Sequence, residues 1–345
     1  GDRGGLGRVS VSRLDRDMCP RSTEIAMRAL VGGAGGFIGT HLVKFLKQNG
    51  YWVRGVDTHL PAYEPSAADE FLLLDLRDRY DCEFAVKEVD EVYQLAASMG
   101  GIGWITQFRA EAAWDNSLIN AYMLWASLLG GVRRFFFASS ACVYPQYRQD
   151  EVNVEPLKES DAFPADPEPG YGFEKLFTEQ MCAYFLQDYG LETRVARLHN
   201  AFGMLGTFDG GREKAPAALC RKIALAKNGD EIEVWRDGKA TRSFMYVDDC
   251  VEGIYRIMQS SCASPLNLGS SRLVTIDELV GIIARIAKKE IKIRHNLSKP
   301  EGVRGRNSDN TKVKSVLGWE PTISLEDGLQ RTYGWIEGQL RKAGR

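Results

Sequence analysis

The sequence predicts an α/β protein built around a doubly wound parallel sheet. Short apolar runs with the composition of buried strands alternate with longer segments of helical period between residues 27 and 198. A glycine-rich turn separates the first apolar run from the first helical segment. Strands that alternate with helices become parallel neighbours, because each helix carries the chain back along a face of the sheet before the next strand begins.

The N-terminal elements follow this pattern in order. Residues 1–26 are rich in Gly, Arg, Asp and Ser and lack the apolar core of a secretory signal, so we expect them to be disordered or a non-native extension. A strand over 28–31 leads through the glycine turn into a helix over 40–50. Further strands are predicted over 51–56, 71–74, 91–95 and 135–138, with a long helical region over 106–129.

Composition excludes several classes of function. The 345 residues can bury a substantial core, and the net charge of −2 gives no reason to expect a nucleic-acid partner. No apolar run approaches the roughly 18 residues that a membrane helix needs, so we expect no membrane partner. The seven cysteines are scattered without a Cys-x-x-Cys pair. This usage favours free thiols, which predicts a reducing compartment, the cytoplasm. It also predicts that the chain has no metal site.

The turn after the first strand has the spacing of a dinucleotide-binding motif. Gly33, Gly36 and Gly39 form Gly-x-x-Gly-x-x-Gly between a strand and a helix. This spacing permits a tight turn, a backbone close to a pyrophosphate, and helix N–H groups that face the phosphates. Asp57 ends the next strand, where an acid accepts from a ribose 2′-hydroxyl and repels a 2′-phosphate. The pattern predicts a Rossmann-type domain that binds NAD, the alternative being a structural turn and a solvated Asp.

The ends of the next strands complete the expected cofactor site. Asp75 and Leu76 follow the third strand and could hold the adenine, although an ordinary helix cap is also possible there. Residues 95–97, after the fourth strand, offer small side chains where a cofactor would lie close to the backbone. The predicted cofactor contacts are Gly33, Gly36, Phe37, Ile38, Gly39, Asp57, Asp75, Leu76, Leu95, Ala96 and Ala97.

The character of the chain changes after residue 198. Glycine-rich loops at 206–211, a helix with Lys and Arg from about 213, and short strands follow. The strands are predicted near 232–235, 242–246 and 291–295. We therefore expect an NAD-binding domain over 27–198 and a smaller C-terminal α/β substrate-binding domain over 199–345, with segments that partly interleave.

Tyr171 and Lys175 have the spacing of a pair that moves a proton off an alcohol. They lie at i and i+4 of a predicted helix over 171–188, and they follow Ser140 at a strand end. In an NAD fold, Lys175 would hold the nicotinamide ribose and also lower the pKa of Tyr171, because a nearby cation favours phenolate. Tyr171 could then take a hydroxyl proton as hydride leaves. The alternative is a Tyr and a Lys on an exposed helical face.

These motifs carry a resemblance to a known family. From about residue 27 to about 339 the chain resembles the extended short-chain dehydrogenase/reductase enzymes of the NAD-dependent epimerase/dehydratase family. The broad motifs are 32–39 and 171–175, and the narrow ones are Gly-Arg-Glu-Lys-Ala-Pro at 211–216 and Glu-Gly-Val-Arg-Gly-Arg at 301–306. The remaining motifs are 99–103, 139–145, 199–200 and 307–310.

The resemblance implies a reaction and an assembly. The narrow motifs are similar to those of enzymes that interconvert GDP-D-mannose with GDP-L-galactose and, by inverting C5 alone, GDP-L-gulose. A GDP-sugar is therefore the expected substrate. The resemblance also implies a homodimer formed through the helices predicted at 106–129 and 171–188. A 4-epimerase, a C5-only epimerase, a dehydratase or decarboxylase of another nucleotide sugar, and a non-enzymatic NAD sensor are the rivals.

The resemblance also implies a second pair of acid/base groups. A ketone at C4 makes the hydrogens at C3 and C5 acidic, and an epimerase must remove a proton from one face and deliver another from the opposite face. Cys142 is implied as the base and Lys214 as the acid, beside Tyr171, Lys175 and Ser140. A cysteine among small residues is otherwise a buried apolar residue, and Lys214 could be a solvated lysine at a helix start.

The same resemblance implies the substrate contacts. Four cations are expected at the diphosphate, because Arg in particular suits bidentate contact with phosphate. His199 is interpreted as a packed structural histidine. The expected substrate contacts are Gly100, Ser140, Ala141, Cys142, Asn200, Glu213, Lys214 and Ala215 for the sugar, and Lys222, Arg242, Arg304 and Arg306 for the phosphates.

Overall fold

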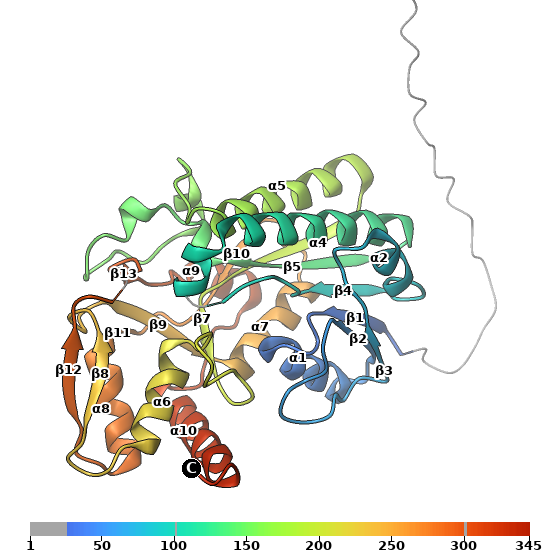
Figure 1. Ribbon diagram of the computed structural model, residues 1–345. Helices are drawn as coiled ribbons and strands as arrows, with labels where there is room; N and C mark the ends of the chain where they lie inside the picture. Colours follow the sequence, from blue (N-terminus) through green and yellow to red (C-terminus); the bar gives the residue numbers. More distant parts are fainter. Residues whose placement is uncertain (1–25, 101, 300–301) are drawn as a thin grey trace, which may run out of the picture.

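The computed structural model describes residues 26–100, 102–299 and 302–345 (Figure 1). The predicted N-terminal extension, apart from Ala26, lies outside the described residues. Gly101 of the motif at 99–103 and Glu301 of the motif at 301–306 also lie outside them. Among the residues that are described, no helix is both long and apolar enough to cross a membrane.

A seven-stranded sheet forms the centre of the larger part, in the order β10-β6-β5-β4-β1-β2-β3. Every pair of neighbours in it is parallel. The chain builds outward from β1 in one direction and then from β4 in the other, which confirms the predicted doubly wound α/β fold. The strands are β1 (Arg28–Gly32), β2 (Trp52–Asp57), β3 (Glu70–Leu73), β4 (Glu91–Gln94), β5 (Arg134–Ser140), β6 (Glu192–Leu198) and β10 (Leu266–Leu268).

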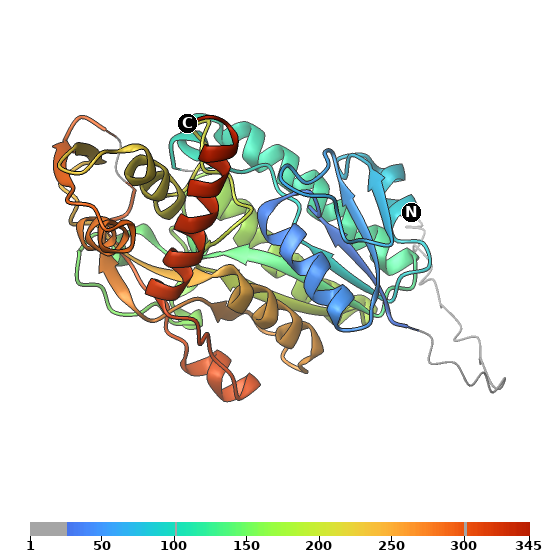
Figure 2. The ribbon, with the colours of Figure 1, turned by 90° about the horizontal axis from the view of Figure 1, so that it is seen from below.

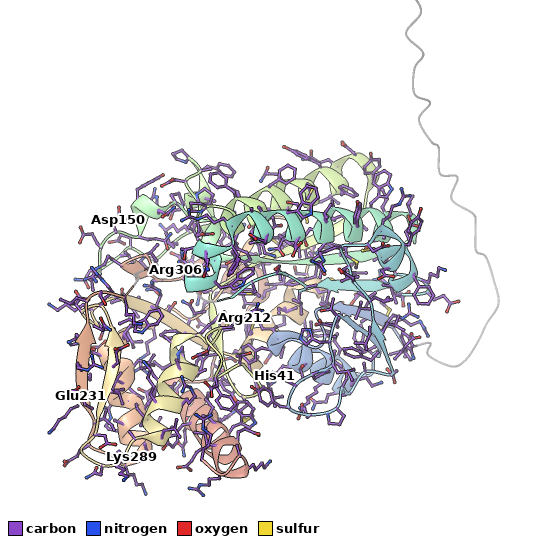
Figure 3. All side chains as sticks on the ribbon, in the orientation of Figure 1. His41, Asp150, Arg212, Glu231, Lys289 and Arg306 are labelled. Carbon is purple, nitrogen blue, oxygen red and sulfur yellow. The ribbon has the colours of Figure 1, made fainter. Side chains whose placement is uncertain are left out.

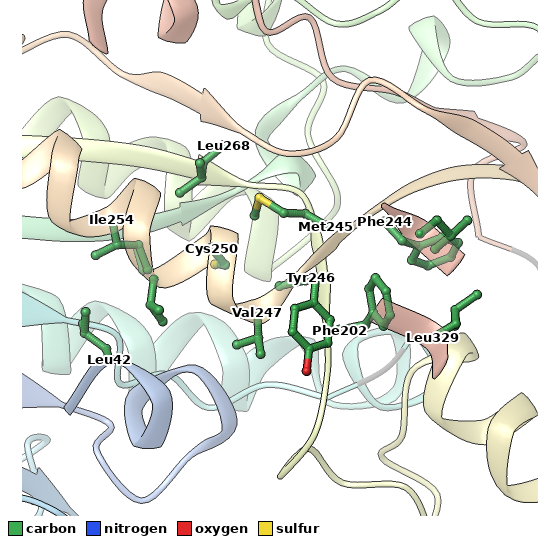
Figure 4. Packing of buried hydrophobic residues seen from close by; sticks show 14 of the residues in the cluster. Leu42, Phe202, Phe244, Met245, Tyr246, Val247, Cys250, Ile254, Leu268 and Leu329 are labelled. Atoms are coloured by element: carbon green, nitrogen blue, oxygen red, sulfur yellow. The ribbon is translucent and has the colours of Figure 1, made fainter. Parts of the chain in front are cut away.

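Helices cover both faces of this sheet, as Figures 1 and 2 show. The alternation of β5 explains the two layers, because Phe135 and Phe137 pack into one core and Phe136 into the other. The second of these cores includes Leu42, Cys250 and Ile254 and continues into the C-terminal part (Figure 4). The helices are α1 (Phe37–Gln48) and α7 (Val247–Gln259) on one face, and α2 (Arg79–Ala85), α4 (Arg109–Leu129) and α5 (Tyr171–Tyr189) on the other.

Two smaller sheets form the rest. One pairs β8 (Glu231–Trp235) with β12 (Lys292–Asn296). The other centres on β9 (Thr241–Tyr246), whose neighbours are β7 (Asn200–Phe202), β11 (Leu273–Thr275) and β13 (Gly305–Arg306). The helices here are α6 (Ala215–Leu225), α8 (Ile276–Ala287), α9 (Thr311–Leu317) and α10 (Leu325–Lys342). Single turns η1 (Ala141–Val143), η2 (Gln146–Arg148) and η3 (Glu159–Ala162) lie between β5 and α5.

Two helix predictions were wrong in detail. The first helix begins at Phe37 rather than at residue 40, because Gly36 is already its extended N-cap. The region expected as one helix over 106–129 is divided at Phe108 into α3 (Ile102–Gln107) and α4. The backbone of Phe108 (φ −117°, ψ 47°) is not helical, so the chain turns there before α4 runs along the sheet.

Candidate active site

The glycine-rich turn between β1 and α1 leaves a space, here called the cradle, that side chains at Gly33 and Gly39 would fill. Gly33 has a φ of +80°, and a Cβ there would lie 2.9 Å from the backbone nitrogen of Ala96. A Cβ on Gly39 would lie 2.0 Å from the carbonyl oxygen of Gly33, so only glycine lets α1 start this close to the turn. The first N–H groups of α1 therefore face a space bounded by backbone, which fits the pyrophosphate of a dinucleotide.

Asp57 is fixed beside this cradle. Its Oδ2 accepts from the Gly35 N–H at 2.9 Å, and its Oδ1 accepts from the Thr58 N–H at 2.7 Å. The carboxylate thus stands at the carboxyl end of β2, next to the glycine turn, where an acid can meet a ribose. Phe37 and Ile38 form the first turn of α1 and are half-buried there.

The segments after β3 and β4 differ in what they offer the cofactor. The N–H of Leu95 donates to the carbonyl of Gly32 at 3.1 Å, so half-buried residues 95–97 run along the glycine turn. Asp75 is engaged by the Arg77 guanidinium at 2.7 Å, and those hydrogen bonds lower its pKa. The side chain of Leu76 is buried in the core. The structure therefore brings residues 95–97 to the cradle, whereas Asp75 and Leu76 have other partners.

Tyr171 and Lys175 are buried together at the start of α5. The Lys175 Nζ lies 5.5 Å from the centre of the Tyr171 ring and 4.7 Å from that of Phe137. We expected Lys175 to lower the pKa of Tyr171, but burial is the larger effect and raises it, while the hydrogen bond with Ser140 acts in the opposite direction. Burial also lowers the pKa of Lys175. In this environment Tyr171 holds its proton firmly.

Cys142 lies in the turn η1, directly against Tyr171. Its N–H donates to the Ser140 Oγ at 3.2 Å, which caps the turn. A Cβ on Gly172 would lie 2.4 Å from the Cys142 carbonyl, so a glycine is needed for α5 to begin this close. The Arg306 Nη1 donates to the Cys142 Sγ at 3.6 Å. The thiol is thus placed between the Tyr171 cluster and a guanidinium from the far end of the chain.

Lys214 is the N-cap residue of α6. Its side chain is exposed by accessible area, yet surrounding protein atoms crowd the ammonium enough that desolvation lowers its pKa. The Cys142 thiol acts on that pKa in the opposite direction. Arg212, two residues earlier, is labelled in Figure 3, and its guanidinium lies 5.6 Å from the centre of the Trp104 ring on α3.

The four predicted phosphate ligands are not gathered equally. Arg306 and Arg242 are register partners on β13 and β9, and Arg306 also donates to the Gln149 Oε1 at 2.5 Å. Arg242 donates to the Val303 carbonyl at 2.6 Å. Arg304 makes a two-point ion pair with Asp237, at 2.9 and 3.1 Å. Lys222 donates to the Glu233 carbonyl at 2.8 Å, whereas Arg306 contacts the Cys142 thiol directly.

The predicted sugar contacts lie on several different elements. Asn200 donates to the Ser243 carbonyl at 3.1 Å, and a Cβ on Gly100 would lie 2.7 Å from the Trp104 side chain. Glu213 accepts from the Gly211 N–H at 2.6 Å and meets Arg221 at 3.3 Å. Ala141 is buried in η1, and Ala215 is the first residue of α6.

A buried ion pair beneath the site was not predicted. Glu179 accepts from Arg197 at 2.7 Å and from the Ser139 Oγ at 2.5 Å. Arg197 also donates to the Tyr144 hydroxyl at 3.3 Å, so the pair holds the residues on both sides of the turn η1. The position of Glu179, four residues after Lys175, places it on the same face of α5 and was the available signal.

Glu168 is a second residue that the sequence interpretation missed. Its N–H donates to the Cys142 carbonyl at 3.0 Å, and burial raises its pKa. His199 is buried as expected, with its Nε2 3.0 Å from the Asn267 Oδ1. Among the described residues, no group of three or more His, Cys, Asp or Glu could hold a metal ion.

Comparison of the sequence with known protein families identifies the family to which the chain belongs. The model of the NAD dependent epimerase/dehydratase family matches residues 29–269. The chain belongs to this family. Members use NAD, and the glycine cradle with Asp57 fits that cofactor.

Individual relatives agree with the family assignment and confirm the resemblance drawn from the motifs. GDP-mannose 3,5-epimerase 1 of Oryza sativa subsp. indica is 45% identical over 97% of this chain and 88% of the relative. GDP-mannose 3,5-epimerase of Arabidopsis thaliana is 43% identical over the same shares. Among solved structures, the UDP-glucose 4-epimerase of Thermotoga maritima has a TM-score of 0.81 and 28% identity, covering 91% of this chain and 100% of the other.

Proposed function

We propose that this protein is an NAD-dependent epimerase that interconverts GDP-D-mannose and GDP-L-galactose and forms GDP-L-gulose by inverting C5 alone. One observation carries the proposal. A thiol that oxidation and reduction at C4 do not need stands against Tyr171 and receives a hydrogen bond from Arg306. The sequence identity with plant GDP-mannose 3,5-epimerases supports the same substrate.

The chemistry at C4 falls to Tyr171, Lys175 and Ser140. Bound NAD would supply the capacity to take a hydride from C4 and to return it. Tyr171, in its phenolate form, accepts the proton of the C4 hydroxyl and later gives it back, and its raised pKa makes the phenolate a strong base for the first of these transfers. Ser140 hydrogen-bonds the Tyr171 hydroxyl and so fixes its direction. Lys175, buried beneath the Tyr171 ring, would hold the nicotinamide ribose.

Proton exchange at C5 and C3 falls to Cys142 and Lys214. A carbonyl at C4 acidifies both neighbouring C–H bonds. Cys142 removes a proton from one face, and Lys214, which comes from a different element, delivers one to the opposite face. The lowered pKa of Lys214 makes its ammonium a better proton donor than that of a solvated lysine.

The diphosphate and the sugar have separate ligands in this proposal. Arg306 carries five N–H donors, more than its hydrogen bonds to Gln149 and Cys142 require, and can also bind a phosphate oxygen. Binding there would place the sugar ring beside the thiol. The remaining proposed contacts are Lys222, Arg242 and Arg304 for the phosphates, and Gly100, Ser140, Ala141, Asn200, Glu213 and Ala215 for the sugar.

The test is a product profile. GDP-D-mannose and UDP-glucose are incubated separately with the NAD-loaded protein, and the nucleotide sugars are separated by chromatography. We expect GDP-L-galactose and GDP-L-gulose from the first substrate and no epimer from the second. The formation of UDP-galactose with unchanged GDP-mannose would assign the protein to the 4-epimerases instead. Cys142→Ala should lose the GDP-mannose products, and Cys262→Ala is the matched control because Cys262 lies outside the site.

We also propose that the protein is a homodimer. The face formed by α4 and α5 carries several exposed aromatic side chains, and Trp125 and Phe185 line an apolar depression on it. Burial of such a patch in a second copy is favourable. Phe177→Glu should yield monomers in analytical ultracentrifugation, and Leu297→Glu, an equally exposed position on the other lobe, should not. The exposed aromatic residues are Trp114, Trp125, Phe173, Phe177, Tyr184 and Tyr189.

Two further proposals concern placement and boundaries. The cytoplasm is proposed as the compartment, on the scattered cysteines of the sequence. The division into an NAD-binding part over 27–198 and a mainly substrate-binding part over 199–345 is proposed with interleaving, since β10 and α7 pack with the large sheet.

A further inference from the structure

Three aromatic rings from distant parts of the chain meet beside the glycine turn. Tyr63 follows β2, Phe208 lies in the loop after β7, and Trp335 lies on α10. The Tyr63 ring stacks on Phe208 at 6.0 Å and meets Trp335 edge-on at 4.9 Å. Phe208 and Trp335 are 5.5 Å apart, also edge-on. Each ring therefore contacts both others, and the cluster joins three segments that share no strand or helix.

The segments that the cluster joins also bound the cofactor cradle. A cavity of about 100 Å³ has Gly35, Gly36 and Phe37 on one side. The segment that includes residues 59–64 and the loop residues at 205 and 207 form its other walls. The two segments that carry Tyr63 and Phe208 thus lie over the glycine turn. A dinucleotide on that turn would lie next to both segments.

The second of these segments leads directly to the proposed acid. Its start is held by the contact of the His41 Nε2 with the Met204 carbonyl at 2.9 Å. Its middle is held by Arg221, which donates to the Phe208 carbonyl at 2.8 Å, and its end is Lys214 at the N-cap of α6. The position of this loop therefore affects the cofactor cradle at one end and the Lys214 ammonium at the other.

We propose that Tyr63, Phe208 and Trp335 form an aromatic clasp that retains the cofactor between turnovers and holds the loop that ends at Lys214. An epimerase returns the hydride to the sugar from which it came, so its NAD need not exchange between turnovers. Side chains that slow the release of NAD therefore do not lower the turnover rate. The inference rests on the family's cofactor and not on the identity of the sugar.

The experiment measures retention of NAD. Tyr63→Ala, Tyr63→Phe and Trp335→Leu are loaded with NAD and diluted, and the NAD that remains bound is quantified over time by an enzymatic cycling assay on the protein fraction. We expect Tyr63→Ala and Trp335→Leu to release NAD at least about tenfold faster, which corresponds to about 1.4 kcal/mol. Tyr63→Phe keeps the ring and should retain NAD like the wild type.

Tyr80→Ala is the matched control, because Tyr80 is an exposed aromatic residue of α2 outside the cluster. Thermal unfolding of each variant without NAD checks that the chain is folded. Wild-type release rates in both Tyr63→Ala and Trp335→Leu would overturn the clasp, and so would equally fast release in Tyr63→Phe. Absence of GDP-mannose products with altered NAD release would refute the proposed substrate and leave the clasp standing.

Discussion

Removal of the Glu179 carboxylate should damage the catalytic turn through a buried ion pair. The Glu179 side chain is 0% exposed and that of Arg197 is 4% exposed. Burial is the largest single effect on the pKa of Arg197 and lowers it, but the hydrogen bonds to Glu179, the charge of Glu179 and the contact with Tyr144 together raise that pKa. In Glu179→Ala, Arg197 stays held by the Glu159 carbonyl at 2.7 Å and keeps its charge without a carboxylate partner.

The magnitude follows from what is left unpaired. Glu179→Ala removes the hydrogen-bond acceptor of the Arg197 Nε and Nη2 donors and of the Ser139 hydroxyl. Breaking one side of a buried pair costs about 3–5 kcal/mol. Replacing both partners by apolar residues of similar volume is often neutral, so Glu179→Leu with Arg197→Met should recover most of the free energy of unfolding.

Urea unfolding and steady-state kinetics on the two variants separate stability from positioning. Both should show a reduced kcat, because Ser139 and Tyr144 lose the anchor that holds the turn carrying Cys142. A single variant within 1 kcal/mol of the wild type would refute the energetic reasoning. A stable double variant with wild-type kcat would show that the pair does not position the turn.

Three other predictions concern the described residues. Burial lowers the pKa of Lys214 below the 10.5 of an ordinary lysine. If Lys214 is the acid, kcat/KM should fall with rising pH at values below 10.5, and Lys214→Arg should move this fall to higher pH. A fall at the same pH in Lys214→Arg would contradict the role. Burial lowers the pKa of His199 to about 4, so the unfolded state binds more protons as pH falls from 6.5. The protein should therefore lose up to about 3 kcal/mol over that window, and His199→Gln should lose less in the same urea titrations. Gly39→Ala should abolish the NAD binding measured by calorimetry, or prevent folding, because the Cβ of the new alanine would lie 2.0 Å from a carbonyl oxygen. Normal NAD binding would show instead that the turn relaxes around this Cβ.

Much of the fold could be predicted because its signals are local. The glycine spacing, the strand-end Asp57 and the i, i+4 pair of Tyr171 and Lys175 are each specified within a few residues. The strand β10, in contrast, is three residues long and joins the large sheet from position 266. Nothing in so short a run indicates which sheet it enters, because pairing depends on how the intervening chain packs.

The individual residues of the site could be predicted from the sequence, but their contacts could not. Cys142 and Arg306 were each singled out from the sequence, but only the fold brings them within 3.6 Å. Asp75 and Arg304 were also singled out from the sequence, but only the structure shows that their charges are paired with Arg77 and Asp237. Such pairings depend on side-chain directions in neighbouring segments, and the sequence pattern does not specify them. Glu179 shares a helix face with Lys175, but its partner Arg197 is known only from the sheet.

Exchange of substrate protons with solvent tests the central claim most directly. The NAD-loaded protein is incubated with GDP-D-mannose in D₂O, and the recovered nucleotide sugars are examined by NMR. The account predicts deuterium at C5 and at C3 in the wild type, and none at either carbon in Cys142→Ala. A folded, NAD-loaded wild-type protein that leaves both positions protonated would contradict it.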